Sequence, residues 1–76
     1  MKELVVYIAK NIVNNPNAVK IEEYKRARNH IDLRLRVDPD DMGRVIGRGG
    51  RVVNAMRSLV RVAAIKQGKR VNLEIR

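Results

Sequence analysis

The apolar positions near the start of the chain follow a helical period. Within residues 2–14 they recur every three or four residues, at Leu4, Val5, Ile8, Ile12 and Val13. This spacing places them on one side of a helix. Asn14-Asn15-Pro16 follows, and proline cannot continue a helix because it lacks a backbone N–H group. We therefore expect an amphipathic helix over residues 2–14.

From Ala18 onward the period changes to alternation, which is typical of strands with one buried face. Val19 and Ile21 alternate with charged residues, and a longer alternating segment covers residues 31–37. In that segment the apolar positions are Ile31, Leu33, Leu35 and Val37. The polar stretch 25–29 separates the two segments, so we expect a hairpin with a loose turn.

The sequence Asp38-Pro39-Asp40-Asp41 indicates the start of a helix. Aspartate is a favoured N-cap, proline fits the first helical position, and acidic groups suit the positive end of the helix dipole. We expect a short helix with Met42, Val45 and Ile46 on its apolar side, ending at Gly47.

A second, longer helix is expected from about Gly50 to Gln67, closed by Gly68. After it, residues 71–75 alternate again and predict a last strand. The expected order is α-β-β-α-α-β, an α+β fold in which helices cover one face of a three-stranded sheet.

The apolar side of the longer helix is unusually wide. On a helical wheel it spans about 200°, whereas one packed face needs a stripe of roughly 100°. Burial against both the sheet and the first helix is one explanation. The other is that one shoulder meets a second chain, which predicts a dimer interface at Ala55, Leu59 and Val62.

Composition limits the class of protein. The chain has 76 residues and no cysteine, so we expect one domain over residues 1–76 without disulfides or thiolate metal sites. No apolar run approaches the roughly 18 residues of a membrane span, which predicts a soluble, intracellular protein without membrane insertion.

The charge is strongly asymmetric. Residues 1–43 hold eight Lys/Arg and seven Asp/Glu, whereas residues 44–76 hold nine Lys/Arg and only Glu74. A surface of one sign attracts polyanions through counterion release and faster encounter. The clustering favours a nucleic-acid partner over a basic surface that serves only solubility.

The sequence contains few candidate catalytic residues. His30 is the only histidine and Ser58 the only serine, and a metal site lacks a second imidazole. Capping explains the acidic residues at the helix start. We expect a protein that is not an enzyme and that needs no cofactor or metal.

The most informative stretch holds three glycines between two apolar segments: Gly47, Gly49 and Gly50. It is not a Walker loop, because no Lys-Ser/Thr follows, and it is not a dinucleotide loop, because it lies between two helices. A plain turn would explain one glycine. A DNA-binding helix-turn-helix is a further alternative, with Asn54, Arg57 and Arg61 in a major groove.

Single-stranded nucleic acid is often bound on aromatic stacking platforms. Tyr7 and Tyr24 are the only aromatic residues, so a binder of this composition must grip the backbone instead. Residues 45–53, Val-Ile-Gly-Arg-Gly-Gly-Arg-Val-Val, resemble the core of a KH domain, with its GXXG loop between two helices. The element order is similar to type II, the bacterial KH arrangement, over essentially the whole chain. The Met-Lys-Glu-Leu-Val opening and the segments 43–48 and 68–71 are similar to small stand-alone bacterial KH proteins.

The resemblance implies a function and a site. It implies binding of single-stranded RNA, with a homodimer or a larger KH-domain protein as protein partner. Gly49 departs mildly from relatives that carry Lys or Gln there. The implied RNA-binding residues are Arg44, Val45, Ile46, Gly47, Arg48, Gly49, Gly50, Arg51, Val53, Asn54 and Arg57. The alternative is an adaptor that docks on a protein, with residual RNA binding.

Overall fold

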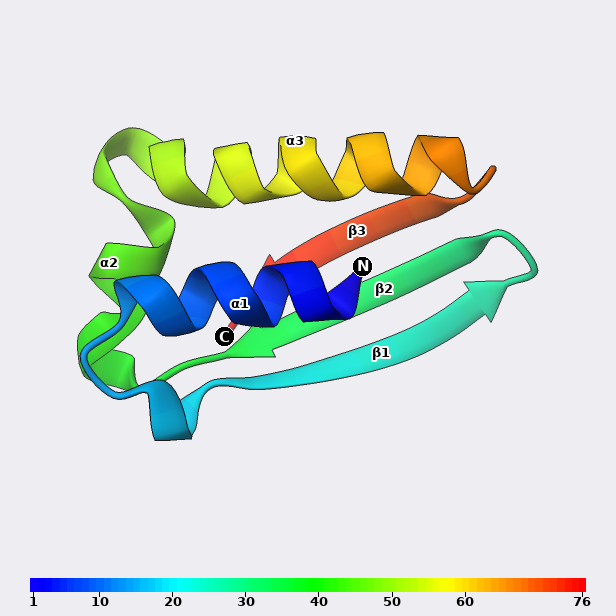
Figure 1. The fold of residues 1–76 in the computed structure, drawn as a ribbon. Helices are drawn as coiled ribbons and strands as arrows, with labels where there is room; N and C mark the ends of the chain where they lie inside the picture. Colours follow the sequence, from blue (N-terminus) through cyan, green and yellow to red (C-terminus); the bar gives the residue numbers. More distant parts are fainter.

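A computed structural model describes every residue from Met1 to Arg76 and contains the expected elements in the expected order. Three α-helices lie over one face of a three-stranded sheet (Figure 1). The α+β prediction is therefore confirmed. The elements are α1 (Lys2–Ile12), β1 (Lys20–Ala27), β2 (His30–Arg36), α2 (Met42–Ile46), α3 (Arg51–Lys66) and β3 (Arg70–Ile75), with 3₁₀ turns at Pro16–Ala18, Pro39–Asp41 and Arg48–Gly50.

The sheet has the order β1-β2-β3. β2 pairs antiparallel with β1 and parallel with β3. The parallel pairing follows from the crossover, because α2 and α3 carry the chain over the sheet before it returns as β3 (Figure 1). Both ends of α3 are thereby fixed relative to the sheet.

The core lies between the sheet and the helices. Leu33 and Leu35 of the central strand are completely buried, and the helices cover them. Fully buried apolar side chains of this kind each stabilise the fold by about 1.5–3 kcal/mol relative to exposure. The helical contributions come from Val5, Ala9, Val45, Met56 and Val60.

The loose turn predicted for residues 25–29 is wrong. β1 continues to Ala27, and only Arg28 and Asn29 form the turn, with an irregularity in register between Lys25 and Ala27. β1 is an edge strand whose side chains are mostly exposed. Its polar residues can therefore join the backbone ladder without burying charge, which is why an apolar pattern did not reveal them.

The predicted helix start is confirmed, and its aspartates make contacts beyond capping. The Asp38 carboxylate accepts a hydrogen bond from the Asp40 N–H at 2.9 Å. Asp41 is almost fully buried, and its two oxygens accept hydrogen bonds from the N–H groups of Asn14 and Asn15, both at 3.0 Å. Asp41 thus ties the segment after α1 to the start of α2.

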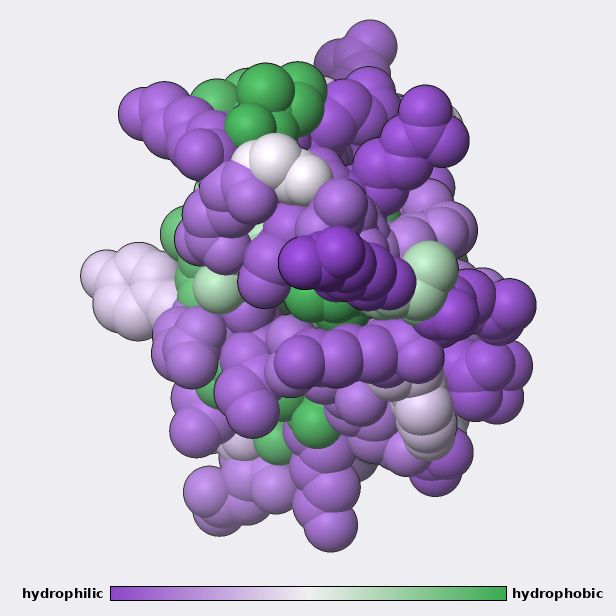
Figure 2. Space-filling view, turned by 90° about the vertical axis from the view of Figure 1, so that its right-hand side faces the viewer, coloured by the Kyte–Doolittle hydropathy of each residue, from purple (hydrophilic) through white to green (hydrophobic).

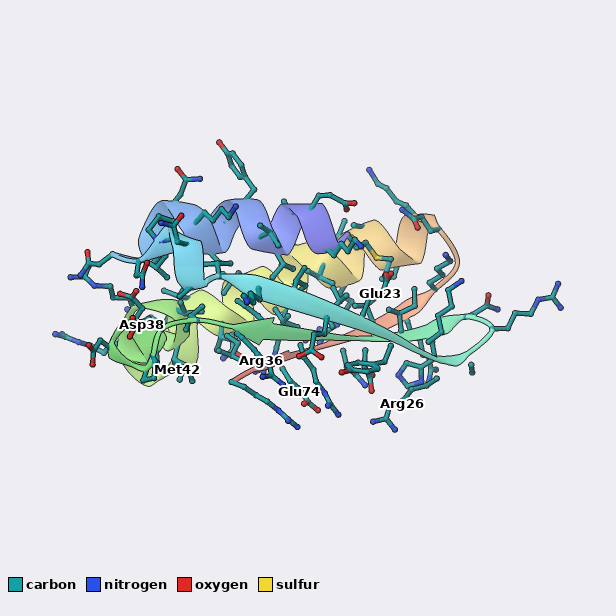
Figure 3. All side chains as sticks on the ribbon, turned by 90° about the horizontal axis from the view of Figure 1, so that it is seen from below. Glu23, Arg26, Arg36, Asp38, Met42 and Glu74 are labelled. Carbon is teal, nitrogen blue, oxygen red and sulfur yellow. The ribbon has the colours of Figure 1, made fainter.

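The face of the sheet away from the helices is a layer of paired charges. In Figure 3, Arg26, Arg36 and Glu74 point away from the helices on this side. Burial raises the pKa of Asp32, but hydrogen bonds from Arg26 and Asn72 outweigh it and hold the pKa below its ordinary value. Four arginines of this open face are therefore paired with carboxylates of the protein. The ion pairs are Arg26–Asp32, Arg36–Glu22 (2.8 Å), Arg34–Glu74 (3.5 Å) and Arg76–Glu74 (3.7 Å).

The wide apolar arc of α3 is only partly buried. Val53, Met56, Val60 and Ala64 form its buried stripe. Leu59 and Val62 remain 51% and 56% exposed, and Ala55 is exposed as well. Packing against the sheet and α1 therefore does not explain the shoulder of the helix. None of the three helices is long and apolar enough to cross a membrane.

Candidate nucleic-acid interface

Gly47 is the residue at which α2 ends, and its geometry admits only glycine. Its N–H donates to the Gly43 carbonyl at 2.9 Å. Its φ and ψ of 78° and 170° fall in a region that only glycine populates. A Cβ there would lie 2.5 Å from Val52 Cγ2 and 2.9 Å from the Val52 backbone nitrogen. The absent side chain lets the loop fold closely onto the first turn of α3.

The other two loop glycines leave the backbone open. Gly49 and Gly50 have φ of 64° and 78°, in the left-handed range. A Cβ on Gly49 would meet no atom within 4 Å. Gly50 is the N-cap of α3 and supplies no capping side chain. The N–H groups of Gly50 and Arg51 donate to the Gly47 and Arg48 carbonyls within the turn. The positive end of the α3 dipole therefore lies beside an exposed loop.

Three arginines surround this loop, as the sequence predicted. Arg44, Arg48 and Arg51 are all exposed. Arg44 comes no nearer than 3.9 Å to the Asp41 carboxylate, and neither of the other two forms an ion pair. Their charge is therefore available to an external anion.

The aliphatic residues expected in the groove divide into two groups. Val45 is fully buried and Val53 nearly so, and both belong to the core. Ile46 is 37% exposed beside the loop. Of the three, only Ile46 offers substantial surface, and the two valines support it from below.

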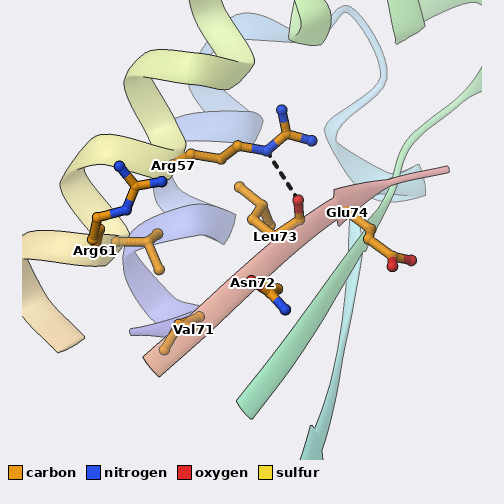
Figure 4. Close-up of a pocket in the computed structure, with 7 residues that line it drawn as sticks. Arg57, Arg61, Val71, Asn72, Leu73 and Glu74 are labelled. Atoms are coloured by element: carbon orange, nitrogen blue, oxygen red, sulfur yellow. Dashed lines mark hydrogen bonds between the residues drawn. The ribbon is translucent and has the colours of Figure 1, made fainter. Parts of the chain in front are cut away.

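Next to the loop, a groove runs between α3 and β3. Arg57 donates from Nε to the Leu73 carbonyl at 3.1 Å and from Nη1 to the Asn54 carboxamide oxygen at 3.3 Å. Figure 4 shows Arg57 reaching across to β3, while Glu74 points away from it. Among the predicted residues, Asn54 and Arg57 thus lie at this groove. Its lining consists of Arg57, Val60, Arg61, Val71, Asn72, Leu73 and Glu74.

The contribution of β3 was missed by the sequence reasoning. β3 pairs only with β2, so its outer edge carries backbone N–H and C=O groups without a strand partner. Arg57 and Arg61 are one helical turn apart, which is a visible signal. The sequence does not show which strand lies beside that turn, because tertiary packing determines it.

The structure brings no catalytic set together. His30 lies on β2, where its Nε2 is 3.2 Å from the Asn72 amide nitrogen and 3.6 Å from Asp32 Oδ1 on the open face. Ser58 is exposed on α3, on the opposite side of the sheet. Acidic residues and histidine do not cluster in threes at any point where a metal ion could bind.

The helix-turn-helix alternative requires a helix that projects into a major groove. Here the Arg57 side of α3 faces the edge of β3, and its guanidinium is bonded to that strand. One of the three residues that this alternative places in the groove is therefore held against the protein's own sheet.

Comparison with known proteins agrees with this geometry. A family model described as KhpA/KhpB, KH domain, matches residues 2–75. The RNA-binding protein KhpA of Caldanaerobacter subterraneus is 49% identical, with 99% of both chains covered, and that of Clostridium perfringens is 48% identical with the same coverage. The KhpA of Aquifex aeolicus is 39% identical, covering 99% of this chain and 94% of its own. The chain therefore belongs to the KhpA/KhpB family of KH domains.

Proposed function

We propose that this protein binds single-stranded RNA through the Gly47–Gly50 loop and the groove between α3 and β3, without catalysis. The observation that carries the proposal is the loop itself, an open glycine backbone at an uncapped helix start with exposed arginines around it. The relatives named above are RNA-binding proteins by name. Its role would be in RNA metabolism or post-transcriptional regulation in the cytoplasm.

Different residues of the site contact the phosphates and the bases. The positive end of the α3 dipole, with Arg48 and Arg51, attracts phosphates. Because Gly49 has open space where a side chain would stand, the RNA backbone can lie directly on the loop. Ile46 packs against bases, and the free edge of β3 offers them hydrogen bonds. Such contacts select single strands of about four nucleotides with little base preference.

The test is a double variant, Arg48→Asp with Gly49→Asp. Aspartate tolerates the left-handed conformation of position 49 better than most residues, so the fold should persist. We expect loss of binding to labelled single-stranded RNA, because like charge then faces the phosphates. Circular dichroism checks the fold. Unchanged affinity would overturn the loop assignment.

A matched control variant separates the effect of changing the loop site from the effect of changing the total charge. Lys2→Asp with Asn17→Asp changes the net charge by the same amount at two exposed positions away from the loop. Lys2 is the first residue of α1, where aspartate suits the helix dipole. This control should weaken RNA binding only slightly. Preference of the parent protein for duplex DNA would favour the helix-turn-helix alternative.

We also propose that the exposed shoulder of α3 is a protein interface, formed by Ala55, Leu59 and Val62. The partner would be a second copy or a larger KH protein such as KhpB, whose KH domain belongs to the same family. Two linked sites raise apparent affinity through effective concentration, which a single small groove needs.

Leu59→Asp tests this interface by sedimentation, because it places a charge where apolar surface would be buried. A dimeric parent should become monomeric, while Ser58→Asp, one residue away, should not change its mass. If the parent is a monomer at high micromolar concentration, self-association is ruled out. Pull-down before and after nuclease treatment then decides whether a protein partner is held directly, as the adaptor alternative requires.

A further inference from the structure

The cations of this protein fall into two classes by their partners. Four arginines on the open face of the sheet, Arg26, Arg34, Arg36 and Arg76, are paired with carboxylates. A second group forms no ion pair: Arg28 from the β1–β2 turn, and Lys66, Lys69 and Arg70 from the end of α3 and the start of β3. We call these four residues the distal basic end. Residues 66–70 contain no acidic residue, and neither do residues 25–31.

The distal basic end lies far from the glycine loop. α3 has 16 residues between the two, and at about 1.5 Å per residue it is about 24 Å long. Figure 1 places the loop at one end of the molecule and the β1–β2 turn at the other. Figure 2 looks onto this far end, where hydrophilic residues cover most of the surface and hydrophobic atoms gather at the edge over α3.

Backbone hydrogen bonds hold the two segments of this end together. Gly68, with φ of 67°, ends α3 and lets the Lys69 N–H donate to the Ala64 carbonyl at 2.9 Å. The Arg70 N–H donates to the Asn29 carbonyl at 2.7 Å. Cations from the turn and from the α3–β3 connection are therefore fixed next to each other although they are far apart in sequence.

A series of hollows that share lining residues runs from this end to Arg57, which is hydrogen-bonded to Asn54, one helical turn from Gly50. The α3–β3 groove shares Arg61 with the next hollow, which adds Ile65, Lys69 and Arg70. That hollow shares Lys69 and Arg70 with a third, which Arg28 also lines. Arg61 forms no ion pair either, so free cations follow the hollows from Arg61 to the C-terminal end of α3.

We propose that the distal basic end is a second phosphate-binding site for the RNA strand that the glycine loop grips. This proposal rests on the RNA-binding function proposed above and extends it. At the rise of about 3.4 Å per nucleotide of a stacked strand, the length of α3 corresponds to about seven nucleotides. A KH groove alone accounts for about four. The distal basic end therefore lengthens the footprint and binds phosphates without reading bases.

The experiment compares oligouridylates of four and twelve nucleotides on the triple variant Arg28→Ala, Lys69→Ala, Arg70→Ala. Each single-strand phosphate contact contributes about 0.7 to the slope of log affinity against log salt. Loss of three contacts should lower the slope for the 12-mer by about 2 and leave the slope for the 4-mer unchanged. The ratio of parent to variant affinity for the 12-mer should then be about twentyfold larger at 50 mM than at 200 mM salt. A longer strand offers more binding registers, but it offers them equally to parent and variant. The ratio of parent to variant affinity at one RNA length is therefore independent of the number of registers.

The control variant is Lys2→Ala, Lys10→Ala, Lys20→Ala, which removes the same charge from exposed positions on α1 and β1. It should lower the affinities for both lengths slightly and alike. Equal losses in the two triple variants, or the same parent-to-variant ratio at both lengths, would overturn the distal site. Thermal unfolding checks both variants, and glutamine in place of alanine keeps the apolar stems if packing is affected.

The two proposals fail in different ways. If the glycine loop does not bind RNA, the variant with Arg48→Asp and Gly49→Asp keeps the 4-mer affinity of the parent. If only the distal site is wrong, that variant loses the 4-mer while the distal triple variant matches its control on the 12-mer.

Discussion

Alanine at position 47 should destabilise the protein far more than alanine at position 49, although both glycines belong to the same loop. The two positions differ in backbone region and in space. Gly47 has φ 78° and ψ 170° and abuts Val52, whereas Gly49 has φ 64° and ψ 19° and faces open space. Comparing the two alanine variants therefore separates the steric requirement at position 47 from the general flexibility of the loop.

The size of the difference can be worked from the geometry. The backbone region of Gly47 costs a non-glycine residue about 1–3 kcal/mol. The overlap of a Cβ with Val52 at 2.5–3.0 Å involves the backbone nitrogen as well as the side chain, and such overpacking adds about 1–3 kcal/mol. At Gly49 the left-handed region costs alanine about 1–2 kcal/mol, and about 0.4–1 kcal/mol is regained from the less flexible unfolded chain. The same regain applies at position 47. We therefore expect losses of about 1–5.5 kcal/mol for Gly47→Ala and about 0–1.5 kcal/mol for Gly49→Ala.

Urea denaturation followed by circular dichroism measures both variants. A loss of 2 kcal/mol would also lower the melting temperature by about 8–16 °C in a domain of this size. Equal midpoints for Gly47→Ala and Gly49→Ala would refute the reasoning, because the contact with Val52 would then not constrain the loop. A change in the denaturant slope would point to an altered unfolded state instead.

Two further predictions concern the start of α2. Asp41→Ala should lower the free energy of unfolding by about 2–4 kcal/mol, because the N–H groups of Asn14 and Asn15 lose their acceptor; a loss below about 1 kcal/mol in denaturation would contradict this. The Asp40 N–H, and then the Asn15 side chain, lower the pKa of Asp38. The ionised Asp38 side chain therefore stabilises the fold fully at neutral pH. This stabilisation is lost as the pH falls from about 4, near the ordinary pKa of aspartate, through the lowered pKa of Asp38. The gap in melting temperature between parent and Asp38→Ala should close over that range, whereas the gap for a nearby non-titrating change, Asn17→Ala, should not depend on pH.

Element types and order were predictable because each left a local signature. Alternation marks β2 and β3, a proline-aspartate start marks α2, and Gly68 marks the end of α3. Each signal depends on a backbone preference or a burial period that acts within a few residues. The polar half of β1 left no such mark, because an edge strand needs only backbone pairing.

The glycine loop was also visible in the sequence, as was the possible shoulder on α3. Other features depend on segments that are distant in the chain. Asp41 looks like an ordinary first-turn acid until its contacts with Asn14 and Asn15 are known. Val45 looks like a groove residue, but packing against α3 and the sheet buries it fully.

The helices and strands, the basic second half and the position of the loop follow from the sequence alone, because local composition and period specify them. Which cations are free depends on the tertiary structure. Arg26 and Arg36 meet carboxylates across the sheet, whereas Arg61 and Arg70 meet none. Net charge counts these arginines alike, but only the pairing of strands and the placing of α3 beside β3 determine which of them an external anion can reach.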